Sequence, residues 1–178
     1  LRLVVDGLEQ RRNYSLSAPA NGRSYRISVK REAGGKVSNH LHDQLHVGDT
    51  LELFPPAGHF TLQAGARPLV LISGGVGITP TLPMLQAALP TGREITFIHC
   101  ARDRGVHAFR EKIDALASRH EQLTRRYCYD QADAGDEVDA QGLLNTDRLA
   151  QWLPASRDAD VYFLGPRGFM NSVRQSLR

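Results

Sequence analysis

A run of small residues follows four apolar residues near the middle of the chain, over Leu69–Pro80. Four consecutive apolar residues suit a buried parallel strand. The glycines at 74, 75 and 77 would let the backbone approach a ligand, and a helix after them would point unpaired N–H groups at it. The stretch therefore predicts a phosphate-binding turn. Because Pro80 stands where the dinucleotide fingerprint G-x-G-x-x-G has its last glycine, an ordinary strand–helix turn is the alternative.

A polar cluster, Arg12-Asn13-Tyr14-Ser15, lies near the start of the chain. An arginine can clamp a phosphate, a tyrosine can pack on a flat ring, and a serine hydroxyl can hydrogen-bond a ring heteroatom. Arg12 and Tyr14 would also point to the same face of a strand. These residue types could therefore hold a nucleotide that carries an aromatic ring system. Taken alone, the cluster fits a polar strand face with one aromatic residue better.

A second pair of glycines, Gly34-Gly35, leads into a short predicted helix over Val37–Leu45. The first turn of this helix holds Ser38 and Asn39, and its free N–H groups could meet a diphosphate. The alternative is a plain helix cap, which we would favour if no companion motif were present.

Composition narrows the class of protein. The 178 residues are 41% hydrophobic and 23% charged, with a net charge of +3, which is ordinary for a globular chain with its own core. The basic residues are mostly arginines scattered along the chain, so we expect anionic cofactors and no nucleic-acid partner. No apolar run approaches the ~20 residues that a membrane span needs. We therefore expect no membrane association and a cytoplasmic location.

Two weaker constellations are expected to be structural. Cys100 and Cys128 both lie in apolar, strand-like contexts, which favours buried free thiols over a disulfide framework. His42 and His46 have the i, i+4 spacing of a helical metal pair, but no third ligand is evident. We therefore expect no metal site.

The first 62 residues alternate between apolar and polar side chains. In Tyr25–Arg31, for example, Ile27 would share one face with Tyr25, while Ser28 and Lys30 would lie on the other. Several short strands at this spacing predict an antiparallel barrel. The predicted strands are Leu1–Val5, Arg12–Ser17, Tyr25–Arg31, Thr50–Phe54 and His59–Leu62.

After Gln63–Pro68 the pattern changes to alternating strands and helices, which predicts a parallel sheet with helices on both faces. We therefore divide the chain into residues 1–64 and 65–178. The acidic segment 130–142 is expected to be a solvated loop. The predicted strands are Leu69–Ser73, Glu94–Cys100, Leu123–Tyr129 and Ala159–Leu164, and the predicted helices are Thr79–Leu89, Val106–Arg119, Thr146–Trp152 and Gly168–Leu177.

With these motifs in this order, the chain resembles the ferredoxin–NADP reductase superfamily. Within it, the chain is most similar to the reductase portion of the flavohaemoglobins, which are nitric oxide dioxygenases. The likeness covers essentially the whole chain, and two segments, Val37–His42 and Val106–Phe109, narrow it to flavohaemoglobin-like reductases. The other segments that carry it are Arg12–Ser17, Tyr25–Glu32, Pro55–Phe60, Ile72–Pro80 and Gly165–Met170.

The resemblance implies a fold and an activity. Residues 1–64 would form an antiparallel FAD-binding β-barrel domain without its N-terminal strand. Residues 65–178 would form a parallel-sheet NAD(P)-binding α/β domain without its C-terminal strand, so we expect a piece of a longer protein. Hydride would pass from NADH or NADPH to FAD, and electrons would then leave singly. Their acceptor would be a haem globin domain of the same full-length protein, outside this chain, or another one-electron acceptor.

The resemblance also assigns residues to roles. Arg12 would contact the FAD diphosphate, Tyr14 would lie against the isoalloxazine, and Ser15 would bond the ring near N5. Thr79 would reach towards the nicotinamide, so Tyr14, Ser15 and Thr79 are the catalytic candidates. The expected cofactor-binding residues are Arg12, Asn13, Tyr14, Ser15, Lys36, Val37, Ser38, Ser73, Gly74, Gly75, Val76, Gly77, Ile78, Thr79, Arg102, Gly165 and Pro166.

Two positions bear on the rate of hydride transfer and on the choice between NADH and NADPH. The family usually has a cysteine where this chain has Leu164; leucine keeps the bulk, so we expect hydride transfer to survive. Arg102 and Asp103 follow the second predicted strand of the α/β part. An acid there favours NAD and an arginine accommodates the NADP phosphate. The resemblance tips the expectation towards NADH.

Two alternatives stay open. The chain could be the reductase component of an oxygenase that feeds a [2Fe–2S] ferredoxin domain. That cluster needs four cysteines in a spacing that this segment does not contain. It could also be a degenerate, non-catalytic nucleotide-binding module that serves as a sensor or scaffold.

Overall fold

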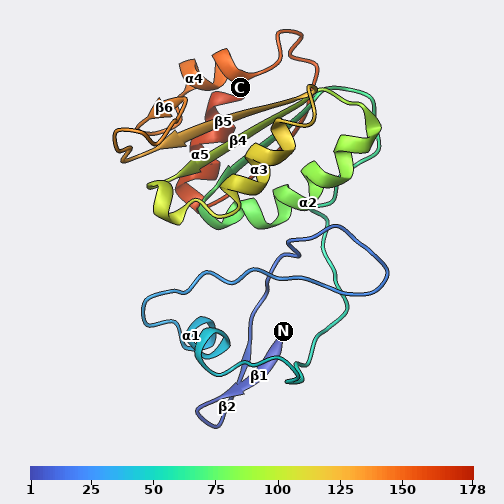
Figure 1. The fold of residues 1–178 in the computed structure, drawn as a ribbon, viewed down its shortest axis with the longest axis vertical. Coiled ribbons are helices and arrows are strands. Elements are labelled where there is room, and N and C mark those ends of the chain that lie inside the picture. The colour runs from blue at the N-terminus through green and yellow to red at the C-terminus, as the bar shows by residue number, and fades with distance from the viewer.

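The computed structural model describes all 178 residues, and the chain forms two parts that lie one above the other in Figure 1. The N-terminal part is at the bottom of this view and the C-terminal part is at the top. A single segment, coloured teal and ending with residues 63–68 just before Leu69, connects them; we call it the crossing segment. None of the helices combines the length and the apolar character that crossing a bilayer would require.

The C-terminal part is built on a five-stranded parallel sheet with the order β6-β5-β4-β3-β7. The four strands predicted here are confirmed, whereas the shortest strand, β6, lies in a segment predicted to be a loop. Two residues of β6 pair with the end of β5, which is too short a segment to show any periodicity in the sequence. The strands are β3 (Leu69–Gly74), β4 (Ile95–Ala101), β5 (Leu123–Tyr129), β6 (Ala140–Gln141) and β7 (Asp160–Leu164).

Helices cover both faces of this sheet, as predicted (Figure 1). The third helix starts later than predicted, at Arg110, because Phe109 before it adopts a left-handed conformation with φ of 63°. A short 3-10 turn, η3 (Arg104–Val106), fills the start of the predicted range. The elements are η1 (Gly75–Gly77), α2 (Ile78–Ala88), η2 (Leu89–Thr91), α3 (Arg110–Ala117), α4 (Thr146–Trp152) and α5 (Arg167–Ser176).

The core explains why β3 reads as one apolar run. All six residues of β3 are buried, because helices lie on both sides of it. Leu69 and Leu71 pack with α2 and α3 in one cluster, while Val70 and Ile72 pack with α4 and α5 in the other. The central strand, with the glycine turn at its end, is therefore held from both faces.

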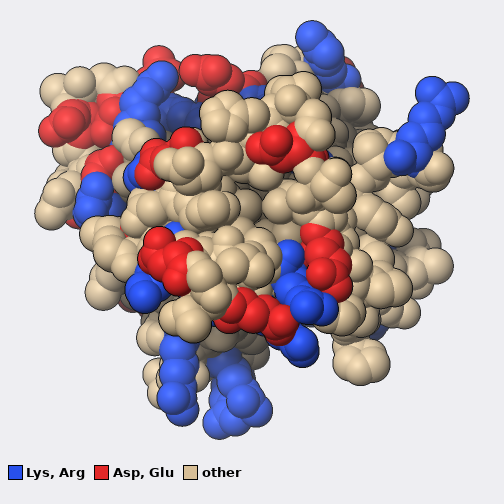
Figure 2. Space-filling model, turned by 90° about the horizontal axis from the view of Figure 1, so that it is seen from below, with Lys and Arg blue, Asp and Glu red and all other residues tan.

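The N-terminal part contains an antiparallel hairpin, β1 (Arg2–Val5) and β2 (Leu8–Arg11), and one helix, α1 (Lys36–Asp43). This small antiparallel sheet followed by a parallel α/β sheet confirms the predicted fold class. The strand at the chain start and the short helix were predicted, whereas β2 was missed. In Figure 2, which views the molecule from below, acidic and basic groups stand side by side on the visible face.

The other four strands predicted in this part are wrong as continuous strands. The segments run without regular secondary structure. One isolated bridge, Leu16↔Ile27, joins two of them, and another, Arg2↔Glu52, joins a third to β1. Tyr25, expected on a buried face, is 63% exposed. Prolines at 19, 55 and 56 lack an N–H to donate, and little apolar surface is buried to hold the segments in register. These segments are Arg12–Ser17, Tyr25–Arg31, Thr50–Phe54 and His59–Leu62.

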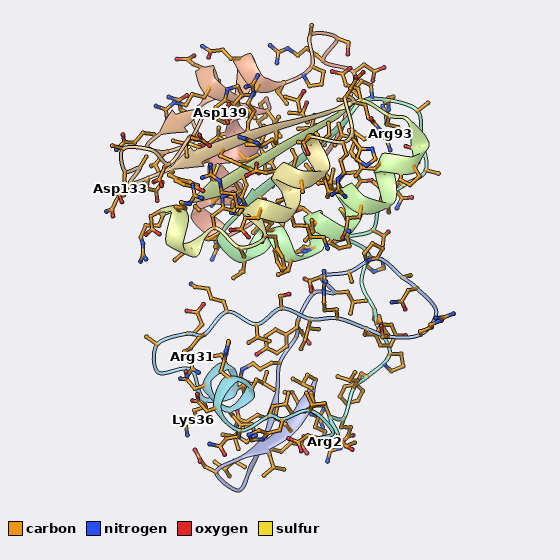
Figure 3. The ribbon with its side chains drawn as sticks, viewed as in Figure 1. Arg2, Arg31, Lys36, Arg93, Asp133 and Asp139 are labelled. Atoms are coloured by element: carbon orange, nitrogen blue, oxygen red, sulfur yellow. The ribbon has the colours of Figure 1, made fainter.

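A charged cluster anchors the crossing segment to the sheet. The buried guanidinium of Arg93 donates to a carboxylate oxygen of Asp160 at 2.6 Å and to the backbone carbonyl of Arg67 at 2.7 Å. Arg67 also forms an ion pair with Asp160, and the backbone N–H of Gln63 donates to the hydroxyl of Tyr162 at 2.9 Å. Figure 3 shows Arg93 at the side of the C-terminal part where this segment enters the sheet.

Candidate functional site

A cavity of about 480 Å³ brings together the motifs that the sequence singled out. It is lined by three segments of the N-terminal part, by the glycine turn after β3 and by the end of β7. The lining residues are Arg12, Asn13, Tyr14, Ser15, Ser28, Lys30, Glu32, Gly35, Lys36, Val37, Ser38, Val76, Gly77, Thr79, Leu164 and Gly165.

Two cations in this lining have no carboxylate partner. The guanidinium of Arg12 donates to the carbonyl of Arg11 at 2.7 Å and to the side chain of Gln10 at 3.3 Å, and it takes part in no ion pair. Lys36, labelled in Figure 3, is the first residue of α1 and also has no ion-pair partner. The acid in the lining, Glu32, is paired with Lys30 at 3.1 Å. The cavity therefore offers two uncompensated positive charges to an anion.

The start of α1 adds backbone donors to the same place. Gly35 is its N-cap, and no side chain caps the helix. Ser38 accepts a hydrogen bond from the backbone N–H of Glu32 at 3.2 Å, which fixes the loop before the helix. A side chain at position 35 would approach the Ser38 hydroxyl to 2.5 Å. The free N–H groups of this first turn are therefore left to a ligand, with glycine allowing close approach.

The aromatic and hydroxyl groups of the Arg12–Ser15 cluster line the cavity as well. Tyr14 is half-buried, and this burial raises the pKa of its phenol while the charge of Arg12 opposes the rise. The phenol is therefore neutral near neutral pH. The side chains of Asn13 and Ser15 are exposed and form no hydrogen bond within the chain. They are free to bond a bound molecule.

The glycine turn packs tightly against the end of β7. A Cβ on Gly77 would overlap the carbonyl oxygen of Leu164 and lie 2.6 Å from its carbonyl carbon. A Cβ on Gly74 would lie 2.9 Å from the ring of Phe169, and Gly75 has a left-handed φ of 52°. No side chain caps η1 or α2, and the hydroxyl of Thr79 donates to the carbonyl of Val76 at 2.9 Å. The turn thus keeps its unpaired backbone N–H groups, as a phosphate site requires.

Six of the predicted site residues lie outside the cavity lining. Ile78 is in the core, and the exposed Arg102 forms an ion pair with Asp103 at 2.8 Å. Ser73 is fully buried, and its hydroxyl lies 2.8 Å from Nδ1 of His99. The two other glycine positions of the turn and the N-cap of α5 complete the set, namely Gly74, Gly75 and Pro166.

Five lining residues were not among the predicted site residues. Ser28 and Lys30 share the polar face assigned to the segment 25–31, so this alternation was the available signal. Glu32 and Gly35 flank the predicted helix start. Leu164 stands where the family usually has a cysteine, and that difference was the available signal for this position.

Ser73 contacts His99, which belongs to a buried polar network next to the turn. The rings of His99 and His107 stack with centroids 4.2 Å apart, and Nδ1 of His107 lies 2.6 Å from the hydroxyl of Tyr129. Arg110 donates to that hydroxyl at 2.9 Å. Burial lowers the pKa of His107 to about 3, and burial followed by the charge of His107 holds the pKa of His99 well below its ordinary value. Both rings are therefore neutral in the folded chain.

These two rings should make the protein less stable in mild acid. Below the ordinary histidine pKa of 6.5 the unfolded chain binds protons that the folded chain does not bind until pH falls to about 3. Stability is therefore expected to fall as pH falls through this window. We expect His107→Gln to remove about one proton from the slope, or ~1.4 kcal/mol per pH unit. Urea unfolding at a series of pH values measures it. The exposed His46→Gln is the control; an unchanged slope in His107→Gln would contradict the expectation.

Comparisons with known proteins agree with this geometry. The model of the oxidoreductase FAD-binding domain matches residues 1–62, and that of the oxidoreductase NAD-binding domain matches residues 71–175. A flavohemoprotein of Pseudomonas putida is 68% identical over 178 residues, which are 100% of this chain and 45% of the relative. A flavohemoprotein of Burkholderia sp. is 61% identical and is matched over 46% of its length by 100% of this chain. The chain thus spans about half the length of these relatives.

Solved structures give the same result. The flavohem-like FAD/NAD-binding domain of the nitric oxide dioxygenase from Vibrio cholerae is 33% identical, with a TM-score of 0.88 over 99% of this chain and 75% of that one. The flavohemoglobin of Malassezia yamatoensis, solved with bound FAD and heme, is 28% identical, with a TM-score of 0.82 over 99% of this chain and 45% of that one.

The fold and the cavity define a class of protein, the flavin-dependent oxidoreductases that bind FAD through one part and NAD through another. The residues present fit these groups, because unpaired cations, two uncapped helix starts and a glycine cradle face one cavity. The chain belongs to the ferredoxin–NADP reductase superfamily, as a member of the flavohaemoglobin reductase family.

Proposed function

We propose that this chain passes electrons from NADH through FAD to a haem globin, as the reductase part of a nitric oxide dioxygenase. The observation that carries the proposal is the shared cavity, in which the Arg12–Ser15 cluster and the start of α1 face the glycine turn. One cavity lined by both predicted nucleotide sites suits a direct transfer between two rings. The flavohemoprotein relatives, which are more than twice as long as this chain, support the globin as the acceptor.

In this proposal the protein positions the two cofactor rings and shields them from water, and the cofactor supplies the redox chemistry. FAD, when bound, accepts a hydride and releases electrons one at a time. Arg12 and Lys36 hold the diphosphate, the neutral phenol of Tyr14 packs on the flat ring, and Ser15 donates a hydrogen bond to it. No side chain acts as a general acid or base. Residues 1–64 and 65–178 serve as the FAD and NAD parts.

The glycine turn and the end of β7 hold the electron donor in the same proposal. Backbone N–H groups at the start of η1 bind the dinucleotide phosphates. Thr79 reaches towards the nicotinamide, and Gly165 borders its pocket. Leu164 lines the cavity with apolar surface and excludes water from it. A pyridine nucleotide as donor is in keeping with a cytoplasmic location.

Arg12→Ala should weaken FAD binding. The guanidinium has no carboxylate partner within the chain. Its removal therefore takes away one of the two uncompensated positive charges in the cavity lining. The loss of one charged hydrogen bond, about 1.5–3 kcal/mol, corresponds to roughly 10- to 100-fold in Kd. Quenching of flavin fluorescence in a titration measures this. Arg11→Ala is the matched control, because Arg11 is exposed and paired with Glu9 at 2.8 Å; equal losses in both variants would contradict the role of Arg12.

NADH should be preferred to NADPH. The guanidinium of Arg102 is held by Asp103, which also accepts from the backbone N–H of Val106 at 3.2 Å, so the acid is fixed at the end of β4. An acid in this place favours the ribose 2′-hydroxyl over a 2′-phosphate. Asp103→Ala should free Arg102 and lower the ratio of kcat/KM for NADH to that for NADPH. A strong preference of the wild-type protein for NADPH would refute the choice.

The absorption spectrum of the purified full-length protein tests the whole proposal. We expect flavin bands that NADH bleaches under anaerobic conditions, together with the Soret band of a haem. Flavin without haem but with an iron–sulfur spectrum would favour the oxygenase reductase instead. A colourless protein that binds no FAD would refute the redox function.

A further inference from the structure

Two cysteines stand directly opposite each other in adjacent parallel strands. Cys100 of β4 is in register with Cys128 of β5, so both side chains point to the same face of the sheet. Neighbouring strands lie about 4.8 Å apart, which brings the two thiols side by side. Cys100 is partly exposed, whereas Cys128 is buried. The pair can therefore be reached from the Cys100 side only.

A cation, Arg148, lies beside the buried member of this pair. Nη1 of Arg148 lies 3.9 Å from Sγ of Cys128 and donates to the carbonyl of Leu143 at 2.9 Å, and Arg148 takes part in no ion pair. Hydrogen bonding with Cys100 lowers the pKa of Cys128, and Arg148 acts in the same direction. Hydrogen bonding with Cys128, and then burial, raise the pKa of Cys100. The carboxylate of Asp130 opposes ionisation of both sulfurs.

The pair thus places two thiols on one face of the sheet beside an unpaired guanidinium. The flavin chemistry above makes no use of it. It lies one strand from the glycine turn, because Cys100 is also in register with Gly74. The carbonyl of Gly142, 2.9 Å from Sγ of Cys128, accepts a hydrogen bond when that sulfur is protonated.

The donor set selects the kind of ion that could replace the two thiol protons. No group of three or more histidine, cysteine or acidic side chains is placed to hold a metal. A four-coordinate zinc ion would therefore lack the ligands it needs. Two thiolates suit a soft ion that accepts two ligands, and Cu(I) prefers thiolates. A monovalent ion between two thiolates leaves one negative charge, which Arg148 compensates. A buried site with this balance avoids an unpaired charge.

We propose that Cys100 and Cys128 form a two-coordinate site for a soft monovalent cation of the Cu(I) class. Two S–Cu bonds form, both thiol protons leave to solvent, and no atom changes its oxidation state. Arg148 is a positioning residue that holds the charge balance without touching the ion.

Competition for Cu(I) with a chromogenic chelator, carried out anaerobically on the reduced chain, tests this site. One Cu(I) per chain is expected for the wild type, with loss of this binding in both Cys100→Ser and Cys128→Ser. Arg148→Met should keep the stoichiometry and weaken the affinity roughly 10-fold. His42→Gln is the control for the other pair of candidate ligands and should bind as the wild type does.

A second measurement needs no variant. Bound Cu(I) should protect Cys100 of the wild-type chain from alkylation by iodoacetamide, as peptide mass spectrometry would show. The proposal is overturned if the wild type binds no Cu(I), if either serine variant binds it as tightly, or if Cys100 is alkylated equally with and without the ion.

Discussion

Gly77→Ala is expected to abolish most of the NADH-dependent reduction of the flavin. The new methyl group would overlap the carbonyl oxygen of Leu164, with the carbonyl carbon at 2.6 Å and the backbone nitrogen of Gly165 at 3.0 Å. These are backbone atoms at the end of a hydrogen-bonded strand, so they cannot turn aside as a flexible side chain could. The glycine turn must therefore move away from β7, and both line the cavity.

The expected size of the effect follows from how strictly hydride transfer depends on position. A displacement of about 1 Å at a reacting centre can cost roughly 100-fold in rate. We therefore expect kcat/KM for NADH to fall by about 100-fold, with a loss of stability of about 1–3 kcal/mol from the strained contact. Stopped-flow measurement of flavin reduction by NADH in the full-length protein gives the rate.

Two controls separate the loss of nucleotide geometry from general damage. FAD affinity should change little in Gly77→Ala, because the proposed FAD-binding residues lie in the N-terminal part. Gly168→Ala is the matched substitution: this glycine lies inside α5, and a Cβ there meets nothing within 4 Å. It should be neutral or slightly stabilising. Wild-type reduction rates in Gly77→Ala would show that the turn does not position the donor.

Asp160→Ala should be the most destabilising single change at the crossing segment. The carboxylate of Asp160 is 14% exposed and receives both Arg93, which is 4% exposed, and Arg67. Removing it leaves the buried guanidinium of Arg93 without a countercharge. Breaking a buried ion pair on one side costs about 3–5 kcal/mol. Denaturant unfolding followed by circular dichroism measures the change.

A neighbouring acid provides the comparison. Asp158 forms an ion pair with Arg67 at 3.4 Å, but its side chain is 74% exposed. Asp158→Ala should therefore cost no more than about 1 kcal/mol. If both alanine variants lost the same small amount of stability, the cluster around Arg93 would not anchor the segment.

The sequence predicted the C-terminal part well, because its signals are local. The apolar run of β3 is buried on both faces, and such a run can be recognised without knowing its neighbours. The turn glycines were found for the same reason, since a strand that ends in glycines and opens a helix is a contiguous pattern. The need for glycine at 77, however, comes from Leu164, which is distant in sequence, and no local pattern contains this contact.

The N-terminal part was harder to predict, because strands depend on partners. The alternation over residues 25–31 predicted one polar face for Ser28 and Lys30, and although the segment is no regular strand, both residues line the cavity. It did not indicate how few backbone hydrogen bonds the segment would form. The stacking of His99 on His107 was also out of reach, because it joins β4 to the loop before α3 through the tertiary fold.

The cluster of Arg67, Arg93 and Asp160 sits at the beginning of β3, and the glycine turn lies at its other end. The six residues of β3 make a rigid arm of about 20 Å between these two places. A rotation of only about 3° at the anchored end would shift the far end by about 1 Å, which is the displacement that hydride transfer does not tolerate. The buried ion pair holds the start of β3 in place. It thereby helps to set the position of the glycine turn, and with it the distance between the two rings, from the opposite end of the strand.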